Sequence, residues 1–240
     1  MGVFLFFRTN SHVVTPNSLL VDKKHAELIL PFMPGEELKY NVYSKGLKIG
    51  RSILTFHGET VLNGIECYHI TFLTKIPLFE DKEEIFADKQ TFLPIRVERS
   101  IRKAIGIRSK VIEEYDQKEF KVVIKQEGAL RTKSQTIQKA GPIYNAILLT
   151  YYCRMMPYVA KDKPFNIVLP TSEYSVLISG EDFIEISSQK YPVTVYSSTP
   201  SKFTFYLSTN SNRVPIKIES HTALDYTMIL NSSIEDTPIK

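Results

Sequence analysis

The chain has 240 residues, of which 43% are apolar and 11% aromatic, and it carries a formal net charge of +4. A chain of this length and composition can bury a full globular core, most simply as one domain. It has no apolar run of about 18 residues, which argues against an ordinary transmembrane helix; its aromatic residues do not interleave with the basic ones, which argues against single-stranded nucleic-acid binding.

Residues 1–34 are predicted to form a leader or extension ahead of the main domain, residues 35–240. The apolar run over residues 1–7 is too short for the core of a signal peptide, so the start is either truncated or carries no signal. Thr15-Pro16-Asn17 favours a short helix over residues 18–30, which two prolines would end.

A β-hairpin is predicted over residues 35–56. Leu38, Tyr40 and Val42 alternate with polar residues, which is the period-two pattern of a strand with one buried face. The apolar residues of the returning strand change parity around Gly50, and a β-bulge there would restore a single buried face.

The period-two pattern recurs in both halves of the chain and predicts an antiparallel meander of about ten to twelve strands. The first meander covers residues 35–139 and the second covers 163–231. The 13 Tyr and 14 Phe residues, with no Trp, suit such sheets. After the hairpin, the segments with a strand pattern are 65–75, 83–87, 94–102, 109–115, 120–126, 132–138, 165–169, 174–179, 183–187, 193–197, 203–208, 214–219 and 226–231.

Residues 142–156 break this pattern and predict one helix between the meanders. Apolar residues recur four apart from Ile143 to Met155, and prolines flank the segment. Apolar residues on nearly every side indicate a buried helix. We therefore expect an all-β fold with one central helix, in which an antiparallel up-and-down meander forms a partial or closed β-barrel around that helix.

Two short segments, residues 93–98 and 214–219, resemble each other. They share three identities and three conservative matches, and each follows an aromatic-bearing strand and a polar turn. A repeated hairpin in two related meanders would explain this, and chance is the alternative.

Basic residues concentrate between Arg96 and Lys139, where twelve Lys and Arg stand against six Asp and Glu. The simpler interpretation is that they are the outward residues of solvated strands. The alternative is a face for anionic lipid headgroups or acidic glycans.

The sequence lacks the familiar motifs for catalysis, cofactors and metals. It contains no GxSxG, HExxH, P-loop or GxGxxG motif, and its five histidines include no pair at HxH or HxxxH spacing. Cys67 and Cys153 form no CxxC pair, so we expect two isolated buried thiols, unless export allows them to pair. Adjacent carboxylates such as Glu83-Glu84 and Glu113-Glu114 point to opposite faces of a strand and cannot cooperate. We expect a protein without enzyme activity, cofactor or metal.

A series of short motifs runs in order along residues 35 to 230. They are Gly35-Glu36-x-Leu38-x-Tyr40, Gly46 and Gly50, Asp88-x-x-Thr91-x-Leu93-Pro94, Tyr151-Tyr152-x-Arg154, Gly180 to Asp182, Tyr206-Leu207-Ser208 and Arg213-Val214-Pro215-Ile216-Lys217-Ile218. Together these residues resemble the bacterial envelope proteins of domain-of-unknown-function family 3108. The chain departs from the family pattern at Ala140-Gly141 and near Asn210, where an acidic residue is usual, at Tyr206, where a Trp is usual, and near Gln189, where a Gly is usual.

The resemblance implies an exported protein of the periplasm or outer cell envelope, either free or lipid-anchored, and rich in β-structure. Members of the family mostly have no assigned activity. The predicted architecture also looks like the open half-barrels that carry lipoproteins, which is an analogy of fold alone.

The candidate ligand-binding residues are Arg154, Tyr151, Tyr40, Tyr68 and Phe72. Inward aromatic residues either fill a core or line an apolar cleft for a lipid tail. Arg154, on the buried helix, would hold an anionic headgroup at the mouth of such a cleft. The alternative for Arg154 is a structural ion pair with Glu36 or another strand carboxylate.

Three functions are compatible with these patterns. The first is a non-enzymatic envelope protein that binds or carries an apolar or amphipathic ligand such as a lipid. The second is a structural or interaction module of envelope assembly, whose basic strands meet an acidic partner, and the third is a hydrolase. Lipid or anionic glycan is the expected partner and nucleic acid is not, while peripheral membrane association and the oligomeric state stay open.

Overall fold

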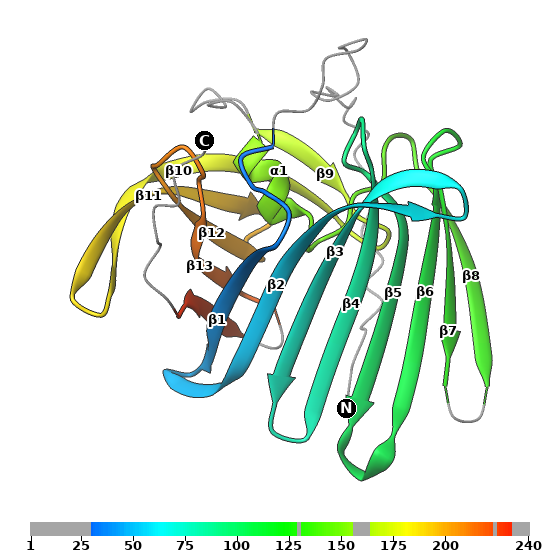
Figure 1. The fold of residues 1–240 in the computed structure, drawn as a ribbon, viewed down its shortest axis with the longest axis horizontal. Helices are drawn as coiled ribbons and strands as arrows, with labels where there is room; N and C mark the ends of the chain where they lie inside the picture. Colours follow the sequence, from blue (N-terminus) through cyan, green and yellow to red (C-terminus); the bar gives the residue numbers. More distant parts are fainter. Residues whose placement is uncertain (1–29, 129–130, 156–163, 223–224, 232–240) are drawn as a thin grey trace.

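The computed structural model describes residues 30–128, 131–155, 164–222 and 225–231, so the predicted N-terminal helix lies outside the described residues apart from Leu30. One antiparallel sheet of fourteen strands makes up most of the described chain (Figure 1). The prediction of an all-β antiparallel meander with one helix is confirmed. The described residues contain no helix long and apolar enough to cross a membrane.

The strands follow one another along the chain with short connections, apart from the helix-bearing link between β8 and β9. Their bounds are β1 Glu36–Ser44, β2 Leu47–Leu62, β3 Ile65–Ile76, β4 Phe79–Asp88, β5 Pro94–Lys103, β6 Arg108–Asp116, β7 Lys121–Glu127, β8 Thr132–Gln138, β9 Phe165–Val168, β10 Glu173–Ile186, β11 Gln189–Thr199, β12 Phe203–Ser208, β13 Pro215–Ser220 and β14 Tyr226–Leu230. A 3₁₀ turn, Ala104–Gly106, links β5 to β6, and the helix α1 spans Leu149–Met155.

The two meanders join through β1, which pairs with β2 on one side and with β14 on the other. The strand order is β8-β7-β6-β5-β4-β3-β2-β1-β14-β13-β12-β11-β10-β9. Since β8 and β9 are the two ends of this order and do not pair with each other, the sheet is open and is not a closed barrel. Figure 1 shows the sheet curving so that its second half lies behind the first, with α1 between them at one end.

The fourteen strands exceed the expected ten to twelve, and of the fifteen segments with a strand pattern two prove to be one strand. Segments 174–179 and 183–187 both belong to β10, which continues past a register shift between Ile178 and Gly180. A bulge at this point lets one strand change its facing without ending. In the sequence, the break in alternation at this point resembles a turn between two strands, but in the structure it is a bulge within one strand.

The predicted bulge near Gly50 is confirmed. Val42 pairs with Gly50 and Tyr43 pairs with Lys48, so Ile49 is the extra residue on β2. Beyond the bulge, Ser52, Leu54 and Phe56 are buried on one face. The change of parity in the sequence therefore corresponds to a β-bulge in β2.

Replacing Gly50 with alanine should lower the free energy of unfolding by about 1–3 kcal/mol, as overpacking does. A Cβ at this position would stand 2.2 Å from the carbonyl oxygen of Lys75 and 2.6 Å from Cγ2 of Ile76. Urea unfolding would measure the loss. Gly180→Ala is the matched control, because a Cβ there meets nothing within 4 Å; equal stability of the two variants would contradict the tight β2–β3 contact.

The helix is shorter than predicted, since residues 142–148 are not helical. The backbone N–H of Tyr144 donates to the carbonyl of Val168 in β9 at 2.8 Å, which holds this segment against the sheet edge. The Asn145 side chain then accepts hydrogen bonds from the backbone N–H groups of Ile147, at 2.8 Å, and Leu148, at 3.3 Å. These contacts satisfy N–H groups that precede the helix and place its start at Leu149, about two turns later than predicted. The predicted last residue, 156, lies outside the described residues.

Packed aromatic side chains close the end of the sheet that carries α1. Phe32, Phe56, Phe92 and Tyr151 form one cluster, with ring centroids 4.7 Å apart for Phe32 and Tyr151 and 6.2 Å apart for Phe56 and Tyr151. The Tyr152 hydroxyl donates to the carbonyl of Phe92 at 2.9 Å, which ties the β4–β5 turn to the helix. The core is therefore filled at this end.

The two cysteines are buried and free, as expected. The suspected repeat is also visible in the backbone. Phe92 and Arg213, each one residue before the repeated segment, both have positive φ, of 57° and 47°. Each turn closes with an equivalent bond, from Asp88 N–H to the Leu93 carbonyl and from Ser208 N–H to the Val214 carbonyl, both of 2.8 Å. The two hairpins thus share a closing bond and a positive-φ residue, although the second turn is one residue longer.

Candidate functional site on the concave face

Arg154 is buried at the C-terminal end of α1 and paired with Glu36 at the start of β1. Its side chain is 1% exposed and that of Glu36 is 17% exposed. Nη1 and Nη2 donate to the two carboxylate oxygens at 2.5 and 2.8 Å. Nη2 also donates to the carbonyl of Pro31 at 3.1 Å, and Nε donates to that of Asn212 at 2.9 Å. The structural ion pair with Glu36, one of the two interpretations of Arg154, is confirmed.

All three guanidinium nitrogens of Arg154 therefore donate hydrogen bonds to acceptors within the protein. The guanidinium also lies 4.9 Å from the ring centroid of Phe32, which covers one side of it. Arg154 therefore joins α1 to β1 and to the loops around Pro31 and Asn212. Its binding of a ligand headgroup stays a prediction, and such a headgroup would have to compete with Glu36.

Tyr40, Tyr68 and Tyr151 belong to the filled core around the helix. Their exposed fractions are 1%, 9% and 0%. The Tyr40 hydroxyl donates to the carbonyl of Pro215 at 3.0 Å. The Tyr151 hydroxyl has no hydrogen-bond partner among the described residues. Burial raises the pKa of Tyr40 and of Tyr151, so both hydroxyls stay neutral.

Phe72 lies farther from the helix, where the concave face is no longer fully covered. Side chains on that face form rows across the sheet, and one row, Phe56, Ile70, Ile85 and Val97, is buried and apolar. The next row toward the far end contains Leu54, Phe72, Glu83 and Arg99. Phe72, Glu83 and Arg99 are only half-buried, so the concave face changes within one row from packed and apolar to amphipathic.

A charged group sits in this amphipathic region. Arg99 of β5 makes a bidentate bond with Asp81 of β4, with Nε 2.9 Å from Oδ1 and Nη2 2.5 Å from Oδ2. Glu83, whose side chain is 15% exposed, has its Oε1 3.5 Å from Nε of the same arginine. Glu113 of β6 faces the same group and accepts a hydrogen bond from the Tyr115 hydroxyl. Three carboxyl groups therefore share one guanidinium.

The excess of carboxyl groups changes their protonation. Burial raises the pKa of Glu83 to about 7, Arg99 partly opposes the shift, and Asp81 and Glu113 add to it. Burial also raises the pKa of Glu113. Glu83 therefore holds a proton over part of the physiological pH range and can donate or accept a hydrogen bond.

Tyr226 of β14 borders the same group from across the concave face. Its pKa is raised mainly by burial, and the charges of Glu83 and Asp81 add to the shift. Along the sheet, β14 and β4 are separated by β1, β2 and β3. The sheet thus curves enough to bring the two meanders within electrostatic reach of each other.

Reasoning from the sequence missed this group because it considered carboxylates that are neighbours in the chain. Glu83 of β4 and Glu113 of β6 lie on either side of Arg99, which β5 carries between them. Neither is grouped with its neighbour in the chain, Glu84 or Glu114. A signal was present, since Glu83 has the same parity as the buried Ile85 and must share its face.

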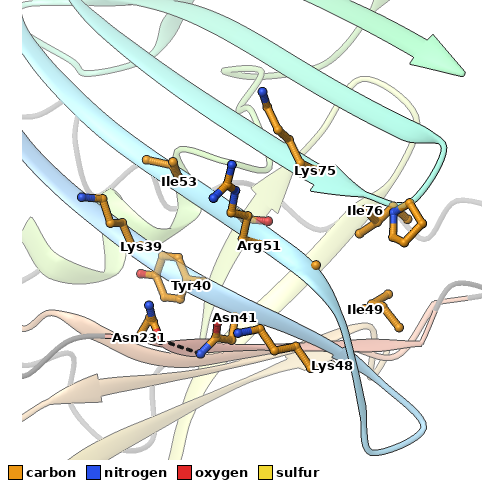
Figure 2. Close-up of a pocket in the computed structure, with 13 residues that line it drawn as sticks. Lys39, Tyr40, Asn41, Lys48, Ile49, Arg51, Ile53, Lys75, Ile76 and Asn231 are labelled. Atoms are coloured by element: carbon orange, nitrogen blue, oxygen red, sulfur yellow. Dashed lines mark hydrogen bonds between the residues drawn. The ribbon is translucent and has the colours of Figure 1, made fainter.

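A separate hollow of about 550 Å³ lies on the convex face, over β1, β2 and β3 (Figure 2). Its charged lining is basic and its apolar lining comes from isoleucines. The labelled residues include Lys39, Lys48, Arg51, Lys75, Ile49, Ile53 and Ile76. The Arg99 group on the concave face has an excess of carboxyl groups, whereas the charged lining of this hollow is basic, so a single ligand chemistry does not suit both sites.

Comparison with known proteins places the chain in a family and supplies no activity. A family model described as "Protein of unknown function (DUF3108)" matches residues 39–231, which is most of the chain. No curated protein and no solved structure matches the chain significantly.

Proposed function

Since the chain belongs to this family, whose description assigns no activity, we propose from its own geometry that it binds or carries an apolar or amphipathic ligand, such as a lipid. The ligand lies on the concave face, in a partial barrel whose other end is filled by α1. The protein acts as a carrier or chaperone in the bacterial periplasm or outer cell envelope and carries out no catalytic step.

The observation that supports this proposal is the amphipathic half of the concave face. Phe72 and Ile101 are half-buried there, next to the Arg99 and Glu83 side chains. A ligand tail would contact the apolar side chains and exclude water from them, while its polar end would meet a charged group that can change its protonation. The open edges at β8 and β9 leave the sheet free to adjust to such a ligand.

Extraction of the purified protein with organic solvent, together with native mass spectrometry, tests the proposal directly. We expect a co-purifying mass that organic extraction removes and that is identified as a lipid or a similar amphipath. A protein that never carries such a mass, and that binds no fluorescent fatty acid after extraction, would overturn the proposal.

The variant Phe72→Gln should weaken fluorescent fatty-acid binding roughly tenfold, because it removes apolar contact area worth on the order of 1.5 kcal/mol. Leu73→Gln is the matched control. Leu73 is the next residue of β3, is also half-buried, and points to the convex face. Equal loss of binding in both variants would show that the ligand does not lie on the concave face.

A further inference from the structure

Three exposed apolar side chains lie at the tips of successive hairpins. Leu47 follows the β1–β2 turn, Leu78 lies in the β3–β4 turn and Ile107 in the β5–β6 turn, with exposed fractions of 71%, 78% and 55%. In an antiparallel meander these alternate turns fall at one end of the sheet. Figure 1 shows the three hairpins ending along the lower rim, opposite α1. We call these three residues the apolar rim.

The hairpins that carry the apolar rim are strongly basic. Segments 45–51, 75–80 and 102–110 contain eight Lys and Arg and a single acidic residue, Glu80. Glu80 is already bound by Lys75, at 3.0 Å. An excess of this size attracts anions to the rim.

The basic hollow of Figure 2 opens directly beside the apolar rim, since Lys48 and Pro77 from the first two hairpins line it. Arg51 and Lys75 are directly opposite each other on β2 and β3. Like charges in this position destabilise a sheet, and a bound anion would relieve that repulsion. Among the described residues, neither Lys48 nor Arg51 makes an ion pair. Two of the four cations that line the hollow therefore lack an acidic partner there, while Lys39 and Lys75 are paired with Glu37 and Glu80.

The opposite end of the sheet provides a contrast. Val61 and Ile65 flank the β2–β3 turn there and are 64% and 52% exposed. The charged residues next to them are acidic, Glu59 and Glu66, and Lys89 binds both, at 2.8 and 3.4 Å. Apolar exposure occurs at both ends of β1 to β6, but of these two described ends the apolar rim is the one that combines it with unpaired positive charge.

We propose that the apolar rim docks this protein onto an anionic membrane surface. Leu47, Leu78 and Ile107 enter the boundary between headgroups and acyl chains, and the basic hollow binds the phosphate or carboxylate of anionic headgroups. The combination matters because either signal alone gives weak and easily reversed binding to a bilayer. The inference depends on the rim and not on the concave face, so it stands apart from the proposed function.

Vesicle co-sedimentation of the whole protein tests this inference, using phosphatidylcholine alone and phosphatidylcholine with phosphatidylglycerol at roughly 2:1. We expect binding to the anionic vesicles alone, weakened at high salt because screening shortens the reach of the charges. Leu47→Ser, Leu78→Ser and Ile107→Ser combined should reduce the affinity about tenfold or more. Lys48→Gln and Arg51→Gln combined should also reduce it and flatten the salt dependence.

The matched control is Val61→Ser with Ile65→Ser, which should bind anionic vesicles as the parent does. All of these sites are at the surface, and thermal unfolding checks that each variant is folded. Equal affinity for neutral and anionic vesicles, no binding by the parent, or equal loss in the control would overturn the inference. A parent dimer that the rim substitutions dissociate would instead assign the rim to self-association. Vesicle binding without any carried ligand would contradict the proposed function alone.

Discussion

Replacing Arg154 with methionine is expected to lower the free energy of unfolding by about 3–5 kcal/mol, the cost of leaving one half of a buried ion pair alone. The Glu36 carboxylate is largely buried and would lose both of its bonds to the guanidinium. The carbonyls of Pro31 and Asn212 would lose their donor as well. Urea unfolding at neutral pH would measure the loss. The slope of unfolding free energy against urea concentration should be compared between the variants.

Two further variants separate the ion pair from a general effect of losing an arginine. Arg51→Met removes an exposed arginine and should change stability by no more than about 0.5 kcal/mol. Arg154→Met combined with Glu36→Gln should cost less than the sum of the two single changes, because the buried charge that lacks a partner is gone. A loss below about 1 kcal/mol for Arg154→Met, or strict additivity in the double variant, would show that the pair contributes little.

The local parts of this fold were predictable from the sequence because strands and turns leave a local pattern. Alternation around Tyr40 located β1, and the parity change at Gly50 located its bulge. The start of α1 was predicted about two turns too early, because periodicity does not show that Tyr144 pairs with β9 or that Asn145 caps the helix. Both contacts depend on elements that are distant in the chain or on side-chain geometry.

The sequence could not predict which distant strands pair with each other. The β1–β14 ladder joins residues such as Tyr40 and Leu230, and because of this ladder the two meanders form one continuous sheet that is open at β8 and β9. The alternation in the sequence places Glu83 and Arg99 on the inner face, but only the register between strands brings them together. The ion pair of Arg154 could be predicted, with Glu36 among the possible partners, because a buried guanidinium requires a nearby acceptor.

Replacing Glu83 with glutamine is expected to stabilise the protein by about 3 kcal/mol above pH 7, and to do so in a pH-dependent way. Burial raises the pKa of Glu83 from 4.5 to about 7, so the folded protein holds this proton more tightly than the unfolded chain does. The stability that the proton provides is complete below pH 4.5 and falls as the pH rises, until it is lost just above 7. Glutamine cannot ionise, so the variant avoids this loss, and its stability relative to the parent rises over that pH interval.

Unfolding in urea at several pH values from 4 to 9 measures the difference in stability. The control is Glu84→Gln, which removes an ion pair with Lys82 on the convex face and should change stability by less than about 0.5 kcal/mol at every pH. A constant difference between Glu83→Gln and the parent would contradict a raised pKa, and the charged group on the concave face would then be fully ionised in the folded protein.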